Sequence, residues 1–154
     1  MKPVSATNQW IIADLVQKWQ GNKQYMLNVL EAMPEEHYGF IPATGMMSFQ
    51  EQASHVANGF NFHLQKLNYT ALPGIRADNK ASILASYEQI FDDIIAFIQQ
   101  YDSGQLSDEQ NTWFGTTTNN RLLYLLDNHL AHHRGQLIIY LRLKGIKAPA
   151  YIGW

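Results

Sequence analysis

Asn128-His129-Leu130-Ala131-His132-His133-Arg134-Gly135-Gln136 holds three of the six histidines in this chain. A helix turns by about 100° per residue, so His129 and His133 project from one face, about one turn apart. Leucines recur around them at helical spacing: Leu122, Leu126, Leu130, Leu137 and Leu141. Because the two histidines fall on or beside this apolar stripe, the stretch predicts an amphipathic helix whose imidazoles face inward.

His129 and His133 have the spacing that two imidazoles need to reach one metal ion. An unpaired polar group buried among apolar side chains costs roughly 1–3 kcal/mol. A divalent metal would satisfy one nitrogen of each ring, while the other donates to a carbonyl or carboxylate. The alternative is that both rings face solvent or backbone and bind nothing. We expect His132 to pack, or to hydrogen bond at the rim, rather than to bind metal.

The composition is that of a folded domain. The chain has 154 residues, of which 46% are hydrophobic and 16% charged, so residues 1–154 are predicted to form a single domain. A net charge of −2 gives no long-range attraction to nucleic acid or to an anionic membrane, and neither partner is expected.

No apolar run approaches the roughly 18 residues that a membrane span needs, and the first residues lack an apolar signal core. These features predict a cytoplasmic protein. The chain has no cysteine, which excludes disulfides, thiolate ligands and a cysteine nucleophile. If thiol chemistry takes place here, the thiol arrives with a substrate.

Four segments repeat apolar residues with a helical period, and no segment alternates as a strand would. They run from Thr7 to about Met33, from Ser48 to about Asn68, from Asn79 to about Tyr101, and from Asn119 or Asn120 to Gly145. The expected caps are Thr7 or Asn8, Ser48 with Glu51 in a capping box, and Asn79 or Asp78. The pattern predicts an all-α four-helix bundle. Connections of about ten to seventeen residues leave the order of up and down helices open, and the polar stretch 102–118 is predicted to be a loop.

The other histidines give weaker signals. His55 lies more than 90° away from the apolar stripe of its predicted helix, so periodicity alone predicts that it is exposed. His63 lies nearer to that stripe, as a structural or rim residue, and His37 lies in a surface loop. The apolar end of the chain, with Tyr151 and Trp154, is expected to pack on its own bundle or on a second subunit.

The last predicted helix also resembles a known family signature. Leu126-Asp127-Asn128-His129-Leu130-Ala131-His132-His133-Arg134-Gly135-Gln136-Leu137, continuing through Tyr140-Leu141-Arg142-Leu143-Lys144-Gly145-Ile146, resembles the signature of the DinB-like superfamily, also called DinB/YfiT-like. The segment from Ser48-Phe49 through His55-Val56-Ala57 is similar to the matching second-helix segment of that family. With the helix lengths in agreement, the resemblance covers nearly the whole chain.

The resemblance implies a homodimeric four-helix bundle that binds a divalent metal, usually nickel or zinc, through three histidines. At the matching positions these are His55, His129 and His133. The third ligand, His55, comes from the resemblance alone, since periodicity places it away from the core. Three neutral imidazoles without a carboxylate leave a position open for water or substrate, as in catalytic metal sites.

Three functions are compatible with such a site. Characterised relatives include S-transferases and an isomerase that use mycothiol or bacillithiol, so the first is a metal-dependent transferase that joins a low-molecular-weight thiol to a small-molecule substrate. The second is a hydrolase, for which no acidic base stands out near the ligands. The third is a non-catalytic, metal-binding dimeric helical module. For Arg134 and Gln136, beside the motif, a structural role is expected.

Overall fold

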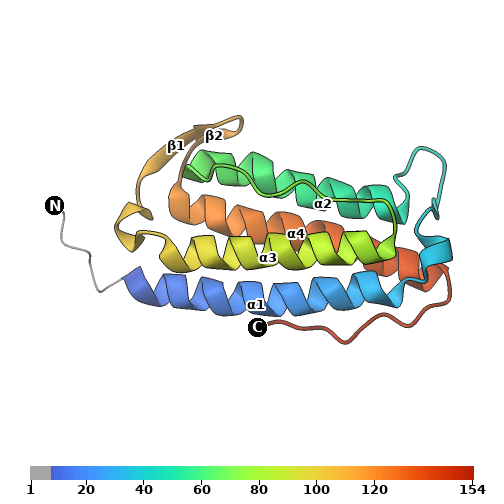
Figure 1. Ribbon diagram of the computed structural model, residues 1–154. Helices are drawn as coiled ribbons and strands as arrows, with labels where there is room; N and C mark the ends of the chain where they lie inside the picture. The colour runs from blue at the N-terminus through green and yellow to red at the C-terminus, as the bar shows by residue number, and fades with distance from the viewer. Residues whose placement is uncertain (1–7) are drawn as a thin grey trace.

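Four long helices and one short hairpin make up the part of the chain that the computed structural model describes, residues 8–154 (Figure 1). The helices are α1 (Gln9–Ala32), α2 (Phe49–Leu64), α3 (Lys80–Gln100) and α4 (Asn119–Leu143), and the strands are β1 (Glu109–Thr112) and β2 (Gly115–Thr118). Short 3-10 helices, η2 (Glu35–His37), η3 (Gln65–Leu67) and η4 (Ser103–Gln105), lie in the connections. The structure confirms the predicted helical bundle.

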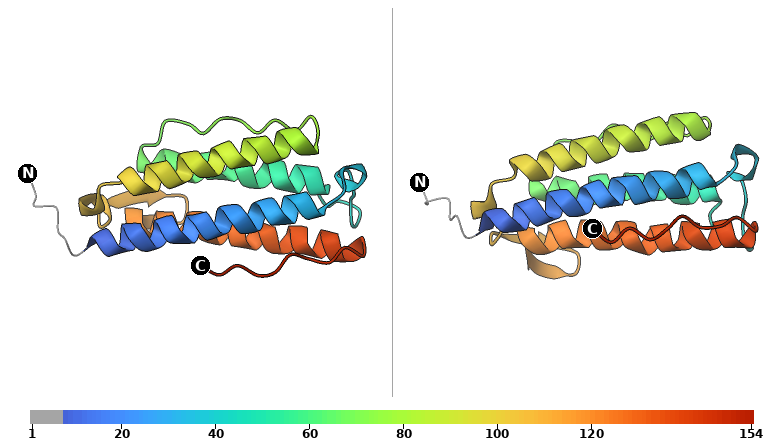
Figure 2. Two further views of the ribbon diagram at one scale, coloured as in Figure 1. Left: turned by 60° about the horizontal axis from the view of Figure 1, so that its bottom comes forward. Right: turned by 90° about the horizontal axis from the view of Figure 1, so that it is seen from below.

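The helices do not alternate up and down. α1 and α4 run in one direction, while α2 and α3 both run in the other (Figures 1 and 2). The connection 68–79 makes this possible, because it returns along the bundle from the end of α2 to the start of α3 (Figure 1). α1 packs mainly against α3, and α2 mainly against α4. This pairing places the second predicted helix antiparallel to the helix with the histidine motif.

Two predicted helix starts are confirmed by their caps. At α2, the Ser48 hydroxyl accepts a hydrogen bond from the Glu51 amide (3.2 Å), and the Glu51 carboxylate accepts one from the Ser48 amide (2.7 Å). At α3, Asn79 forms the same reciprocal pair with Ser82. Each box satisfies two backbone groups that a helix start leaves unpaired.

At the other two helix starts, the structure confirms the start of α4 but shows no capping bond from Asn8 at α1. α4 does begin at Asn119, but Thr118 caps it, by accepting a hydrogen bond from the Arg121 amide. Asn8 occupies the N-cap position of α1, yet its side chain makes no capping bond and instead donates to the Ser103 carbonyl (3.4 Å). Thr7, the other predicted cap, lies outside the described residues.

The prediction of a plain loop over residues 102–118 is wrong. β1 and β2 pair antiparallel from Glu109 opposite Thr118 to Thr112 opposite Gly115. Each strand has four residues and almost all are polar, so no alternation of apolar and polar residues marks them. A positive φ of 115° at Gly115 is compatible with the tight turn.

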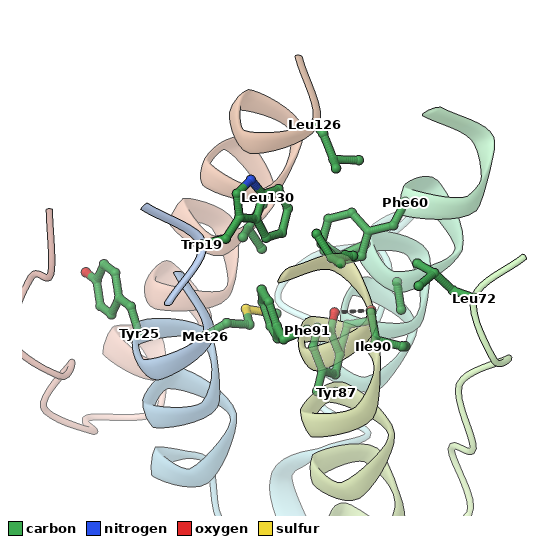
Figure 3. Packing of buried hydrophobic residues seen from close by; sticks show 14 of the residues in the cluster. Trp19, Tyr25, Met26, Phe60, Leu72, Tyr87, Ile90, Phe91, Leu126 and Leu130 are labelled. Atoms are coloured by element: carbon green, nitrogen blue, oxygen red, sulfur yellow. Dashed lines mark hydrogen bonds between the residues drawn. The ribbon is translucent and has the colours of Figure 1, made fainter. Parts of the chain in front are cut away.

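The core is centred on large aromatic side chains from three helices (Figure 3). The ring of Trp19 on α1 meets Phe60 on α2 at a centroid distance of 5.7 Å and Phe91 on α3 at 5.9 Å. The hydroxyl of Tyr87, fully buried on α3, donates to the Ala53 carbonyl of α2 (2.7 Å). These contacts join α2 to α1 and α3 across the core.

The end of the chain packs on its own bundle, running back beside α1 and α4 (Figure 2). Lys18 donates to the Gly153 carbonyl (2.8 Å), and its ammonium lies 4.8 Å from the Trp154 ring centre. A Cβ on Gly21 would lie 3.2 Å from the Trp154 backbone carbon, so a glycine in the middle of α1 lets the tail approach. Tyr151 and Trp154 nevertheless stay 77% and 63% exposed.

Candidate metal centre

The structure brings His55, His129 and His133 together. One ring nitrogen from each lies within 4.8 Å of the others. The ring centroids are 4.6 Å apart for His129 and His133, 4.7 Å for His55 and His133, and 5.9 Å for His55 and His129. This is the only such group of three metal-binding side chains among residues 8–154. The cluster can hold a metal ion.

The His55 ring is open to solvent and still lies beside those of His129 and His133. The side chain is exposed, as periodicity predicts, while His129 and His133 are partly buried. However, the polar side of α2 that carries it also contains Gln52 and Gly59, and both of these contact α4. The polar strip of α2 therefore lies at the edge of its contact with α4, where a residue can be open to solvent and still meet the α4 histidines.

Gly59 makes room for His129. A Cβ at Gly59 would lie 2.8 Å from Nε2 of His129 and closer still to Cε1, so any larger residue would require the ring to move. Gly59 was not predicted as part of the site. Its signal in the sequence is a glycine inside a helix, which costs about 1 kcal/mol relative to alanine, one turn after His55.

Gln52 is the second residue that was not predicted. Its side chain is 3% exposed, and its amide nitrogen Nε2 contacts Nδ1 of His133. Buried amides need hydrogen-bond partners, and this one finds its partner on the histidine cluster. The signal in the sequence is a polar residue three positions before His55, hence on nearly the same side of α2.

Burial favours the neutral form of His129 and of His133. It lowers the pKa of His129 to about 4, and the neighbouring His133, His63, His55 and His132 add to this effect. Burial also lowers the pKa of His133, with further contributions from His55 and His132. Only a neutral imidazole can offer a lone pair to a metal, and both rings are neutral at neutral pH.

The donor set fits a divalent metal. Nδ1 of His129 is buried and has no hydrogen-bond partner in the described part of the chain, a state that costs about 1–3 kcal/mol. Coordination can satisfy such a nitrogen, and imidazole donors suit zinc or nickel. These observations match a site for an ion and are hard to explain for three histidines with a purely structural role.

The remaining histidines lie outside the group of three. The His63 ring lies 5.4 Å from that of His129, and burial lowers the pKa of His63. His132 lies 4.9 Å from His133, and its Nε2 is 3.0 Å from the Gln136 amide nitrogen. His37 lies in η2, within the connection between α1 and α2. His63 and His132 therefore border the site, as rim residues.

Arg134 follows His133 but points into the bundle on another side of α4. It is 5% exposed and donates to Oδ1 of Asn22 on α1 (2.9 Å), while Asn22 donates to Asp127 (2.7 Å). Its guanidinium also lies 4.5 Å from the ring centre of Tyr25. These contacts fix the rotation of α4, which is the structural role expected of Arg134.

A cavity of about 420 Å³ opens beside the cluster. Its lining comes from five residues of α2 and from Met47, which lies in the connection before the Ser48 cap: Met47, Gln50, Glu51, Ser54, His55 and Asn58. His55 is the member of the cluster that lines it, so a molecule in this cavity can reach His55 from solvent. The Glu51 carboxylate also lines it, and the hydrogen bond from the Ser48 amide is the main cause of its lowered pKa.

Within residues 8–154, every helix is too short or too polar to cross a lipid bilayer. No membrane-spanning helix is therefore described, in agreement with the sequence.

Comparisons with known proteins agree with the fold and the motif. The model of the DinB family matches residues 4–153. Over 137 residues, 85% of this chain and 89% of the relative, the sequence is 23% identical to "Uncharacterized protein YjoA" of Bacillus subtilis (strain 168).

Two crystal structures are similar to the bundle. A DinB-like protein from Bacillus cereus ATCC 10987 has a TM-score of 0.77 at 20% identity, covering 89% of this chain and 95% of that one. The DinB-like protein YjoA from Bacillus subtilis has a TM-score of 0.75 at 20% identity, covering 92% of this chain and 99% of that one. With the family model spanning nearly the whole sequence and the same fold in both crystal structures, this chain belongs to the DinB family.

Proposed function

We propose that His55, His129 and His133 bind one divalent metal, nickel or zinc, in a single-domain enzyme that transfers a low-molecular-weight thiol to an electrophilic small molecule in the cytoplasm. The observation that carries the proposal is the convergence of three imidazoles, one of which has a buried nitrogen without a hydrogen-bond partner, beside a cavity that opens to solvent at His55. Imidazole-only sites of this kind leave a coordination position for a substrate.

The residues of the chain have separate tasks in this proposal. A metal held by three imidazoles lowers the pKa of a thiol or water bound to it. His129 and His133 supply neutral rings, since burial keeps their pKa values low. Gly59 leaves space for the His129 ring, and the cavity beside His55 admits the small molecules. The chain has no cysteine, so the reacting thiol belongs to a cosubstrate.

A homodimer is part of the same proposal. Tyr151 and Trp154 remain largely exposed although the tail packs on its own bundle. Exposed aromatic side chains are common at interfaces between subunits. Sedimentation of the purified protein would measure its oligomeric state directly.

The first prediction tests the metal site and the activity together. In protein purified without an affinity tag, His129→Ala and His133→Ala should each abolish stoichiometric metal binding, measured by elemental analysis, with helical content retained in circular dichroism. His55→Ala should weaken metal binding and tests the third ligand separately. The parent protein, but none of these variants, should then consume an electrophile in the presence of a low-molecular-weight thiol.

Unchanged metal content in the His129 and His133 variants would refute the site. If His55→Ala keeps the affinity of the parent, the third ligand is another residue, and His63 or His132 would be tested next.

The Glu51 carboxylate favours hydrolysis as the second candidate, because it lines the same cavity as His55. A carboxylate there could act as a base toward a metal-activated water. Its hydrogen bond to the Ser48 amide holds it in the helix cap, which makes thiol transfer the better proposal. Metal-dependent cleavage of an ester or amide without thiol would support hydrolysis, and binding without any turnover would indicate a non-catalytic module.

A further inference from the structure

We propose that Gln52 is a positioning residue of the metal centre, whose side-chain amide holds the His133 ring in one orientation by pairing with Nδ1 in either tautomer. The inference rests on the proposed metal site and goes beyond it by naming what orients one of the ligands. Gln52 lies on α2, three positions before His55, and His133 lies on α4, so the contact joins the two helices that form the cluster.

The contact is partly buried and specific. The Gln52 side chain is 3% exposed, and Nδ1 of His133 is the hydrogen-bond partner of its amide. Among the three clustered histidines, His133 is the one for which the described residues provide a hydrogen-bond partner. A glutamine placed only to fill space would carry the cost of burying an amide for no gain over methionine.

The position of the proton on the His133 ring decides which nitrogen is available to a metal. A neutral imidazole has one nitrogen that donates and one that accepts. The amide nitrogen of Gln52 can only donate, so with Nε2 of Gln52 facing it, Nδ1 of His133 accepts and the proton lies on Nε2 of His133. In this tautomer Nδ1 is used by Gln52 and Nε2 is protonated. Neither nitrogen has a free lone pair for a metal.

Metal binding therefore requires the other tautomer. With Nδ1 facing Gln52, Nε2 is the nitrogen left for an ion, and the proton must move to Nδ1. Nδ1–H then donates, and the amide must present its oxygen, Oε1. A half-turn of the terminal amide exchanges its nitrogen and oxygen with little change of shape. Gln52 can thus pair with His133 in both forms, and it holds the ring in the same orientation while the proton changes nitrogen.

The second prediction uses three variants of the tag-free protein. Gln52→Met keeps the length of the side chain but removes both donor and acceptor, and its affinity for Zn²⁺ should fall about 10- to 100-fold. Gln52→Glu keeps an oxygen that accepts from Nδ1–H, and its affinity should stay within a few-fold of the parent. Gln89→Met on α3 is the control, because the Gln89 amide donates to the Asp93 carboxylate (2.9 Å) and not to a histidine. Competition with a chromophoric chelator measures all four affinities.

If Gln52 only fills space in the core, the order of the Zn²⁺ affinities of the two variants should be reversed. Methionine would then be tolerated, and a buried glutamate would be harmful. Equal affinities in the parent, Gln52→Met and Gln52→Glu would overturn the role of Gln52 while leaving the metal site intact. A parent protein that binds no Zn²⁺ would overturn both proposals.

Nitrogen-15 NMR of the parent protein tests the tautomer without any substitution. His133 should carry its proton on Nε2 in the metal-free protein and on Nδ1 once Zn²⁺ is bound. The same tautomer in both states would overturn the inference, even if the variants fail to fold.

Discussion

At the scale of single residues, the site depends on two small features of α2 that carry no metal-binding group. Gly59 leaves the space that the His129 ring fills, and Gln52 pairs with His133. Helical spacing predicted His129 and His133 correctly as neighbours on one face. It could not predict Gly59 or Gln52, because their roles arise only where α2 meets α4, and a single helix does not contain that contact.

The third prediction concerns Gly59→Ala. The added Cβ would lie 2.8 Å from Nε2 of His129, so the ring must move, and metal affinity should fall at least tenfold as measured by chelator competition. Overpacking lowers the free energy of unfolding by about 1–3 kcal/mol, and the higher helix propensity of alanine offsets about 1 kcal/mol of this loss.

Gly135→Ala on α4 is the matched control, since a Cβ there meets no atom within 4 Å. It should keep the metal affinity and stabilise the fold by up to about 1 kcal/mol. Parent-like affinity in Gly59→Ala would show that the ring does not need this space.

The fourth prediction follows from the pKa of His129, which burial lowers from an ordinary value of 6.5 to about 4. Between these values the unfolded chain binds a proton that the folded chain does not, so unfolding becomes easier as pH falls. The metal-free protein should therefore lose stability from about pH 6.5 down to pH 4, measured by urea denaturation. His129→Gln should flatten this part of the profile, and an equal slope in that variant would assign the loss to other groups.

At the scale of helices and strands, the sequence predicted most of the architecture. The apolar repeats of 3.6 residues and the Ser48 and Asn79 caps are local features, and the four long helices follow from them. The hairpin of β1 and β2 escaped prediction because strands of four mostly polar residues carry too little pattern. The direction of α3 could not be predicted, because the connection 68–79 is long enough to reach either end of the bundle.

The fifth prediction concerns the contact between α1 and α4. Asn22 is 2% exposed and links Arg134 to Asp127, so Asn22→Ala would leave a buried guanidinium without this acceptor. The loss should be about 1–3 kcal/mol in the free energy of unfolding, measured with urea. Gln24→Ala, which removes only an exposed bond to Asn28, should change stability by less than about 0.5 kcal/mol. Equal effects in both would mean that the Asn22 network adds no stability.

At the scale of the whole molecule, the bundle explains how an outward-facing histidine can join an inward-facing pair. α1 and α3 form one packed pair of helices, α2 and α4 the other, and the histidines lie along the second pair. Periodicity on α2 alone placed His55 in solvent, and the family resemblance placed it on the metal site. Both are compatible because the edge of the α2 and α4 pair is open beside the cavity.

The position of α3 and of the connection 68–79, between the two helices that carry the histidines, has a consequence for biosynthesis. His55 and the α4 histidines stand more than seventy positions apart, and α3 is made between them. Closing so long a loop costs chain entropy that only the docked helices repay. The ribosome must therefore complete α2, α3 and most of α4 before the three imidazoles can meet, so an ion can be captured only after α4 has left the exit tunnel.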